Sequence, residues 1–209
     1  MLEIKRFIFG PFETNCYVVT TDEQVLLIDP ACSYEYEQQQ LLDYIENQKS
    51  KIPNPKLSLI ATHGHLDHLW GAKWACDQWQ TAVYMHAADI PMAQAMQQQY
   101  DLFGVRRKAE LFPIENLKSE LSHQQSPISN FQLLETPGHT PGSVCFYFQE
   151  DKVLFSGDSL FQMGYGRTDL PGGNYFQLID SLERLFALPS DVQVYPGHGE
   201  MTTIGAEKR

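Results

Sequence analysis

The chain is poor in positive charge. Its 209 residues include 15 Lys and Arg against 26 Asp and Glu, which gives a formal net charge of −11 at pH 7. Proteins that bind nucleic acids neutralise phosphates with a patch of basic side chains, so we expect no nucleic-acid partner. The short basic run Arg106-Arg107-Lys108 is interpreted as a solvated surface patch rather than as a contact for an anionic substrate.

Long apolar runs and paired cysteines are also missing. No stretch is long enough to span a bilayer, and residues 1–7 lack the apolar centre of a signal peptide and predict a strand instead. The four cysteines contain no Cys-x-x-Cys pair. Scattered thiols in a chain without a leader are typical of reducing compartments, so we expect a cytoplasmic protein without membrane contact. The thiols are Cys16, Cys32, Cys76 and Cys145.

The pattern of apolar and turn residues predicts strand clusters separated by helices. With 43% hydrophobic residues, the chain is long enough for one sizeable core, and we expect a single domain over residues 1–209. The segment 90–125, rich in Gln and Met, is the least regular part. The predicted strands are 4–9, 16–19, 25–28, 57–61, 83–85, 131–135, 144–149, 152–156 and 192–195, and the predicted helices are 34–49, 67–80 and 174–187.

The densest chemical signal is the run Thr62-His63-Gly64-His65-Leu66-Asp67-His68, directly after an apolar strand. Imidazole and carboxylate groups together bind zinc, iron or manganese. One tetrahedral ion does not easily take all four side chains from so short a segment. The alternate residues His63 and His65 can point to one ion, and Asp67 and His68 can serve a second. The spacing therefore indicates two metal ions.

Three further ligand-type residues lie in Gly- and Pro-rich turns at strand ends. They are His139 in Thr-Pro-Gly-His-Thr-Pro-Gly, Asp158 in Ser-Gly-Asp-Ser, and His198 in Tyr-Pro-Gly-His-Gly. Such loops on a rigid scaffold commonly carry functional side chains, and glycine lets a backbone approach an ion closely. His86 and His123 lack such a setting and are interpreted as non-ligands, His86 at a strand end and His123 in a polar connection.

The order His-x-His-x-Asp-His, then His, Asp and His, resembles the metallo-β-lactamase superfamily from Asp29 to His198. The resemblance implies an α/β fold, an αββα sandwich of two mixed β-sheets flanked by helices. It also implies two divalent ions, zinc first, with iron and manganese as further candidates. In the family, a carboxylate at the position of Asp29 lies under the metal site.

The resemblance also assigns roles to the ligand residues. It implies that His63, His65 and His139 hold one ion, that Asp67, His68 and His198 hold the other, and that Asp158 bridges both. A hydroxide shared by the ions would attack the substrate, and Asp67 would orient that hydroxide. No Ser or Cys nucleophile is required.

The stretches Ser-Gly-Asp-Ser-Leu-Phe at 156–161 and Gly-Tyr-Gly-Arg-Thr-Asp-Leu-Pro-Gly-Gly at 164–173 resemble the short, single-domain glyoxalase II-like branch. That branch hydrolyses thioesters such as S-D-lactoylglutathione. The resemblance therefore implies a hydroxyacylglutathione hydrolase-like enzyme acting on a small-molecule thioester, including glutathione-derived ones. Arg167 is the candidate contact for a substrate carboxylate.

Three alternatives stay open. Persulfide dioxygenases of the same superfamily share the Gly-Arg-Thr-Asp string and use a single iron, held by the positions of His63, His139 and Asp158. A lactonase would need the same pair of metal ions. The third alternative is not an enzyme but an inactive metal-binding interaction module. The seven intact ligand positions argue against it.

Overall fold

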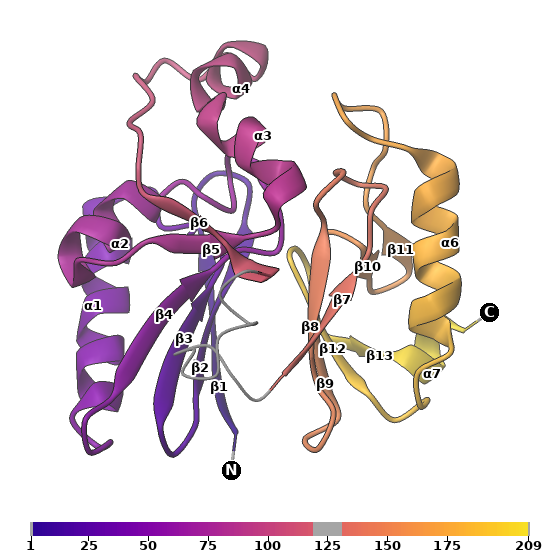
Figure 1. Cartoon of the computed structure of the whole chain (residues 1–209), viewed down its shortest axis with the longest axis horizontal. Coiled ribbons are helices and arrows are strands. Elements are labelled where there is room, and N and C mark those ends of the chain that lie inside the picture. Colours follow the sequence, from indigo (N-terminus) through magenta and orange to yellow (C-terminus); the bar gives the residue numbers. More distant parts are fainter. Residues whose placement is uncertain (1, 119–130, 209) are drawn as a thin grey trace. The chain divides into compact units, whose positions relative to one another are not determined.

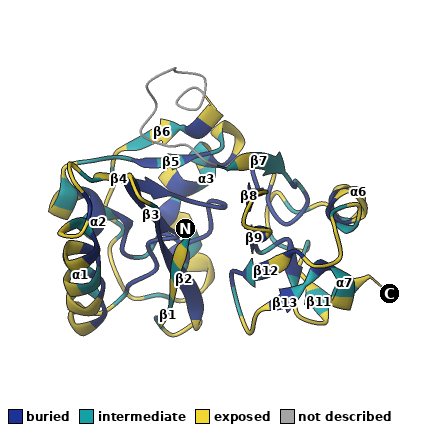
Figure 2. Cartoon of the chain, turned by 90° about the horizontal axis from the view of Figure 1, so that it is seen from below, coloured by how far each residue is buried: buried dark blue, intermediate teal, exposed yellow. Residues whose placement is uncertain are grey.

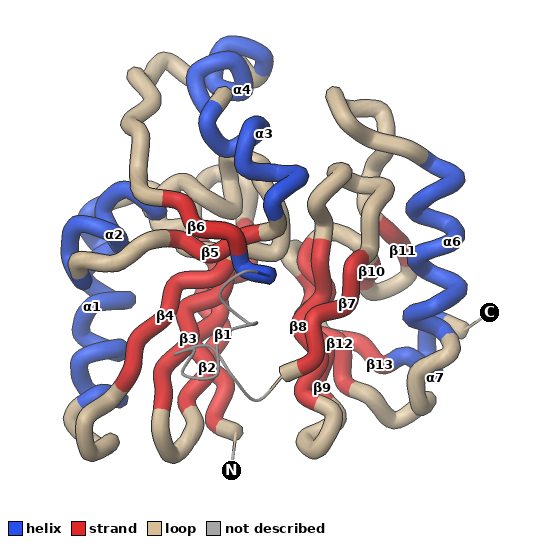
Figure 3. The backbone as a smooth tube through the Cα atoms, viewed as in Figure 1, coloured by secondary structure: helices blue, strands red, loops and turns tan. Residues whose placement is uncertain are grey.

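The structure, a computed structural model, describes residues 2–118 and 131–208. These residues divide into two compact units, the first within residues 1–129 and the second from residue 130 onward. Each unit is built on one β-sheet (Figures 1 and 3). The expectation of a single domain over 1–209 stays a prediction.

The first unit contains a six-stranded mixed sheet in the order β1-β2-β3-β4-β5-β6. The pairs from β1 to β3 are antiparallel, and the pairs from β3 to β6 are parallel. Its elements are β1 Glu3–Phe9, β2 Thr14–Thr20, β3 Gln24–Ile28, α1 Glu35–Lys49, β4 Lys56–Ile60, α2 Ala72–Trp79, β5 Val83–Met85, the 3-10 turn η1 Ala87–Asp89, α3 Ile90–Gln94, α4 Met96–Leu102 and β6 Ile114–Asn116.

Helices α1 and α2 lie along one face of this sheet (Figure 1). Leu41 and Ile45, one helical turn apart in α1, are fully buried and belong to the same apolar cluster as Val25 and Leu27 of β3. The outward side of α1 is exposed, whereas the central strands are buried (Figure 2). The sheet therefore forms a rigid support for the loops that leave the ends of its parallel strands.

The second unit contains a five-stranded mixed sheet in the order β13-β12-β9-β8-β7 and a small hairpin of β10 and β11. Strands β9 and β12 are parallel, and the other pairs of the sheet are antiparallel. Its elements are β7 Gln132–Glu135, β8 Val144–Phe148, β9 Val153–Gly157, β10 Leu160–Phe161, β11 Gly164–Tyr165, α6 Tyr175–Phe186, β12 Gln193–Pro196, β13 Thr202–Thr203 and α7 Ile204–Glu207.

Helix α6 packs on this second sheet through one apolar side. Leu178, Leu182 and Leu185 are buried and cluster with Leu154 of β9 and Val194 of β12. The side chain of Asn174 accepts a hydrogen bond from the amide of Gln177 (3.1 Å), which caps the helix N-terminus. This packing fixes α6 beside the turn that carries His139.

Most predicted elements agree with the structure to within two residues, but the helix predicted over 67–80 is wrong at its start. It begins at Ala72 as α2. The backbone before it is used elsewhere, because the amide of Gly71 donates to the carbonyl of Pro30 (2.8 Å). An added Cβ on Gly71 would also overlap the Cys32 side chain. Close packing against the end of β3 therefore outweighs helix propensity at 67–71.

The segment 90–125 is more regular than expected. Within its described part it holds α3, α4 and β6. Each of these elements is seven residues or shorter, so its periodicity is too short to be recognised from the sequence.

None of the helices in residues 2–118 and 131–208 combines the length and the hydropathy that a bilayer-spanning helix requires. The cytoplasmic location and the absence of nucleic-acid and membrane partners stay predictions.

We expect Leu41→Ala to lower the free energy of unfolding by about 2–5 kcal/mol, because it leaves a cavity between α1 and the sheet. The neighbouring exposed substitution Gln40→Ala should change it by less than about 0.5 kcal/mol. Urea unfolding followed by circular dichroism measures both values. Equal, small effects would contradict the packing described for α1.

Candidate metal centre

The first unit gathers ligand-type side chains in the loop that follows β4. His63, His65 and His68 are buried, and the Asp67 side chain is 17% exposed. The ring centroids of His63 and His68 lie 4.1 Å apart, and those of His63 and His65 lie 4.9 Å apart. The sequence-predicted ligands of this motif are therefore brought together on one buried loop.

Asp29, which follows β3, holds this loop in place through hydrogen bonds. Its Oδ1 accepts a hydrogen bond from the amide of Thr62 (2.7 Å). Its Oδ2 accepts from the Thr62 hydroxyl (2.7 Å) and lies 2.9 Å from Nδ1 of His68. The carboxylate is 1% exposed, and its residue has a positive φ of 55°, a conformation that Asp and Asn tolerate better than most residues.

These contacts fix where the protons of two histidines sit. A carboxylate only accepts, so Nδ1 of His68 carries the proton that faces Asp29. The Thr62 hydroxyl has one proton, which it donates to Asp29, so it accepts the proton of His63 Nδ1 across 3.0 Å. In both rings Nε2 is then the nitrogen with the lone pair, the form in which imidazole binds metals.

Asp67 is oriented from a different strand. Its Oδ2 accepts a hydrogen bond from the hydroxyl of Thr14 in β2 (2.8 Å) and lies 3.5 Å from Nε2 of His68. Thr14 is itself 1% exposed. The carboxylate is thus placed beside the ligand-type nitrogen of His68.

Two residues that the sequence did not single out hold the loop's backbone. The fully buried Asp89 accepts from the amide of Gly64 (2.8 Å). Gln99 in α4 accepts from the amide of Leu66 (2.9 Å) and donates to the carbonyl of Gly64 (3.0 Å). No local pattern marks Gln99 among its neighbouring glutamines, because its role arises only when α4 packs beside the loop.

The second unit gathers the other three predicted ligands at neighbouring strands. His139 lies between β7 and β8, Asp158 follows β9, and His198 follows β12. The Oδ2 of Asp158 lies 3.5 Å from Nε2 of His139 and 3.7 Å from Nε2 of His198. One carboxylate oxygen is thus shared by two imidazoles.

His139 is also held in one tautomer. Its Nδ1 lies 2.7 Å from the carbonyl oxygen of Arg167, which only accepts, so Nδ1 carries the proton and Nε2 is directed at Asp158. Gly166 makes this approach possible, because an added Cβ there would overlap the carbonyl oxygen of Asp158 and lie 3.0 Å from His139 Nδ1.

Arg167 is exposed and paired within its own loop. Its Nε and Nη2 donate to the two carboxylate oxygens of Asp169, each at 2.7 Å. The hydrogen bonds and charge of Arg167 lower the pKa of Asp169 to about 2. A substrate carboxylate that binds Arg167 would have to compete with Asp169.

His86 and the cysteines lie apart from these sets. His86 directly follows β5, as expected, and its Nδ1 accepts from the amide of Ala88 (3.3 Å). His123 lies outside the described residues. All four cysteines are free and buried, and burial raises the pKa of Cys32 to about 12 and that of Cys145 to about 11. Such thiols are poor nucleophiles at neutral pH.

Taken by itself, the donor set of each unit is of a kind that fits a divalent transition metal. It consists of imidazole nitrogens and carboxylates, the groups that zinc, iron and manganese accept, and three of the histidines are fixed with Nε2 as the ligand atom. Comparison with known proteins agrees with this chemistry. The family model described as the metallo-beta-lactamase superfamily matches residues 9–198. The chain belongs to the metallo-β-lactamase superfamily.

Relatives of this superfamily cover nearly the whole chain. A hydroxyacylglutathione hydrolase, GloC, from Haemophilus influenzae is 35% identical over 201 residues, which cover 95% of this chain and 91% of that protein. The crystal structure of TTHA1623 in a di-iron-bound form is 35% identical with a TM-score of 0.83, covering 98% of this chain and 97% of its own. That of the BLEG-1 B3 metallo-beta-lactamase is 32% identical with a TM-score of 0.82, covering 98% and 96%.

These matches confirm the resemblance inferred from the sequence and the fold class. The chain has the metallo-β-lactamase fold, with two mixed sheets flanked by helices. The superfamily supports an enzyme of the metal-binding hydrolase type.

We expect Asp29→Asn to lower metal affinity about 10- to 100-fold. The Asn NH₂ group is a donor and would face Thr62 or His68, which both donate to the carboxylate of Asp29. Asn tolerates the positive φ, so the backbone should be kept. Competition with a fluorescent chelator measures the affinity, and the exposed change Asp151→Asn is the control. Equal affinity in both variants would refute the role given to Asp29.

Proposed function

We propose that the protein is a metal-dependent thioester hydrolase of the glyoxalase II type, with S-D-lactoylglutathione as a representative substrate. The observation that carries the substrate class is the similarity to a hydroxyacylglutathione hydrolase over 95% of the chain. The stretches 156–161 and 164–173, the second of which contains Arg167, resemble this branch of the superfamily.

We propose further that seven side chains are the metal ligands, with two divalent ions bound, zinc first and iron or manganese as further candidates. Ions in such a set lower the pKa of a bound water and polarise the carbonyl under attack. The support is the ligand chemistry of each set and the di-iron-bound form of TTHA1623. The proposed ligands are His63, His65, Asp67, His68, His139, Asp158 and His198.

The chain's own residues prepare this reaction. Asp29 and Thr62 keep the proton of His63 and of His68 on Nδ1, so that neither Nε2 must lose a proton when it becomes a ligand. Asp67, held by Thr14, orients the attacking water. The water oxygen adds to the thioester carbonyl carbon, the carbon–sulfur bond breaks, and a carboxylate and a thiol are released.

A second candidate activity is β-lactam hydrolysis. It is favoured by the 32% identity and TM-score of 0.82 with BLEG-1, described as a B3 metallo-beta-lactamase. A β-lactam amide needs the same water attack but has an amine as leaving group in place of a thiol. The thioester is preferred because the relative named for it is the more similar of the two in sequence.

We expect protein loaded with zinc or with iron to hydrolyse S-D-lactoylglutathione faster than a β-lactam, and a chelator to abolish the hydrolysis. His63→Ala and Asp158→Asn should each lose metal and at least about 99% of the rate, since each removes a ligand from the set. Rates and bound metal are measured together by thiol release and elemental analysis.

His86→Ala is the matched control, a histidine outside both ligand sets that should keep metal and rate. Full metal and full rate in the His63 and Asp158 variants would refute the ligand assignment. If the β-lactam were the faster substrate, the second candidate would replace the first. With neither hydrolysed, oxygen uptake on a glutathione persulfide and hydrolysis of a lactone test the alternatives left open by the sequence.

We propose Arg167 as the contact for an anionic part of the substrate. Arg167→Gln should raise KM about tenfold, the worth of one charged hydrogen bond, with kcat and metal content unchanged. Asp169→Asn should lower KM up to about fivefold, because the Asp169 carboxylate competes with the substrate for the guanidinium of Arg167. Steady-state kinetics of both variants provide the test, and an unaltered KM in Arg167→Gln would remove this residue from the binding site.

A further inference from the structure

A cavity of about 220 Å³ lies in the first unit, between α2, α4 and the segment 105–112. None of the seven proposed metal ligands lines it. One water molecule accounts for about 30 Å³ of liquid, so the cavity has room for a group of several atoms.

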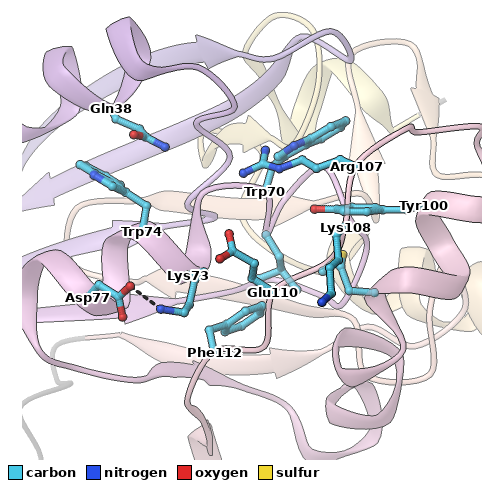
Figure 4. Close-up of a pocket in the computed structure, with 12 residues that line it drawn as sticks. Gln38, Trp70, Lys73, Trp74, Asp77, Tyr100, Arg107, Lys108, Glu110 and Phe112 are labelled. Atoms are coloured by element: carbon cyan, nitrogen blue, oxygen red, sulfur yellow. Dashed lines mark hydrogen bonds and ion pairs between the residues drawn. The ribbon is translucent and has the colours of Figure 1, made fainter.

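Four aromatic side chains form part of the walls of this cavity, beside charged and polar ones. Trp70, Trp74, Tyr100 and Phe112 line it (Figure 4). The rings of Trp70 and Tyr100 lie 5.9 Å apart at an angle of 31°. These surfaces suit a flat or apolar group, which gains from leaving water.

The hydroxyl of Tyr100 is directed into this space. Tyr100 is 4% exposed, and no described residue forms a hydrogen bond with its hydroxyl. Figure 4 shows this hydroxyl pointing toward the side of the cavity where Arg107 and Glu110 lie. Because this hydroxyl both donates and accepts and has no partner among the described residues, it is available to a polar atom of a ligand in the cavity.

Charges of both signs reach the same hydroxyl. Arg107 lowers and Glu110 raises the pKa of Tyr100, while its burial is the largest cause of the net rise. Within the part of the chain that the structure describes, the side chains of Arg107 and Glu110 form no hydrogen bond or ion pair. Two further cations, Lys73 and Lys108, line the cavity, and Lys73 is paired with Asp77.

We propose that this cavity binds a small zwitterion, an α-amino acid with an aromatic or apolar side chain. Its carboxylate pairs with the guanidinium of Arg107 and accepts from the Tyr100 hydroxyl. Its ammonium group pairs with Glu110, and its side chain lies against the aromatic walls. Arg107, interpreted from the sequence as part of a solvated patch, thus has a ligand-binding role.

Three related compounds test this assignment on the full-length, metal-loaded protein. L-phenylalanine carries both charges, 3-phenylpropionate lacks the ammonium group, and 2-phenylethylamine lacks the carboxylate. Two of the chain's three tryptophans line the cavity, so intrinsic fluorescence reports occupancy, and calorimetry gives the affinity. We expect phenylalanine to bind at least about tenfold more tightly than either analogue.

Variants separate this cavity from other sites. Arg107→Gln should weaken phenylalanine binding about tenfold, whereas the matched change Arg106→Gln, at a residue that does not line the cavity, should leave it unchanged. Glu110→Gln should remove the preference for phenylalanine over 3-phenylpropionate while binding of the latter is kept.

Three results would overturn the proposal. One is the absence of a fluorescence change or heat with any of the compounds up to about 10 mM. Another is equal binding of phenylalanine and 3-phenylpropionate to the unaltered protein. The third is binding that survives Arg107→Gln unchanged, as chelation of the metal ions by the amino acid would. None of these results bears on thioester hydrolysis, since the compounds contain no thioester.

Discussion

The loop 62–68, which carries the ligand-type residues of the first unit, depends on the hydrogen bonds of one buried carboxylate, that of Asp29. A buried charge is tolerated only where donors surround it, and Thr62 and His68 supply three. The amide of Asp29 also donates to the carbonyl of Ile60 (2.9 Å), so the contact continues the pairing of β3 with β4. The register of these two strands therefore sets the positions of His63 and His68, and through them the side of each ring that is available to a metal.

In the second unit, a backbone carbonyl rather than a carboxylate accepts the proton of the histidine. Gly138, with a φ of 138°, lies against Leu178 of α6, and its carbonyl accepts from the amide of Asn174 (2.7 Å). Gly166 lets the Arg167 carbonyl reach Nδ1 of His139. The uncharged carbonyl of Arg167 thus sets the tautomer of His139, as the carboxylate of Asp29 sets that of His68. The two sets of ligand-type residues are therefore held in place by different kinds of hydrogen-bond acceptor.

The ligand-type residues could be predicted from the sequence, and Asp29 beneath them from the family resemblance, but the other residues that hold the loop 62–68 could not. His63, His139 and Asp158 could be found because ligand chemistry and glycine-rich turns are visible along the chain, and the strands could be found because their apolar residues alternate with turns. Asp89 and Gln99 could not, since each acts on backbone 25 to 35 residues away and nothing local marks it. The helix expected from residue 67 begins later for a related reason, because the amide of Gly71 is bound to Pro30. The Arg167–Asp169 pair is local, yet residue spacing alone gave no indication that the two would satisfy each other.

Two short segments contribute both to the loop 62–68 and to the cavity lined by Tyr100 and Trp70. In α4, Gln99 binds the loop backbone while its neighbour Tyr100 lines the cavity. After the loop, His68 contacts Asp29 and Trp70 lines the cavity two residues later. A shift of α4 would consequently move a support of the loop and a wall of the cavity together. Substitutions in the segment 105–112 avoid this coupling, because among the described contacts of the loop none comes from that segment. Changes at Arg107 and Glu110 therefore probe the cavity while leaving the support of the histidines in place.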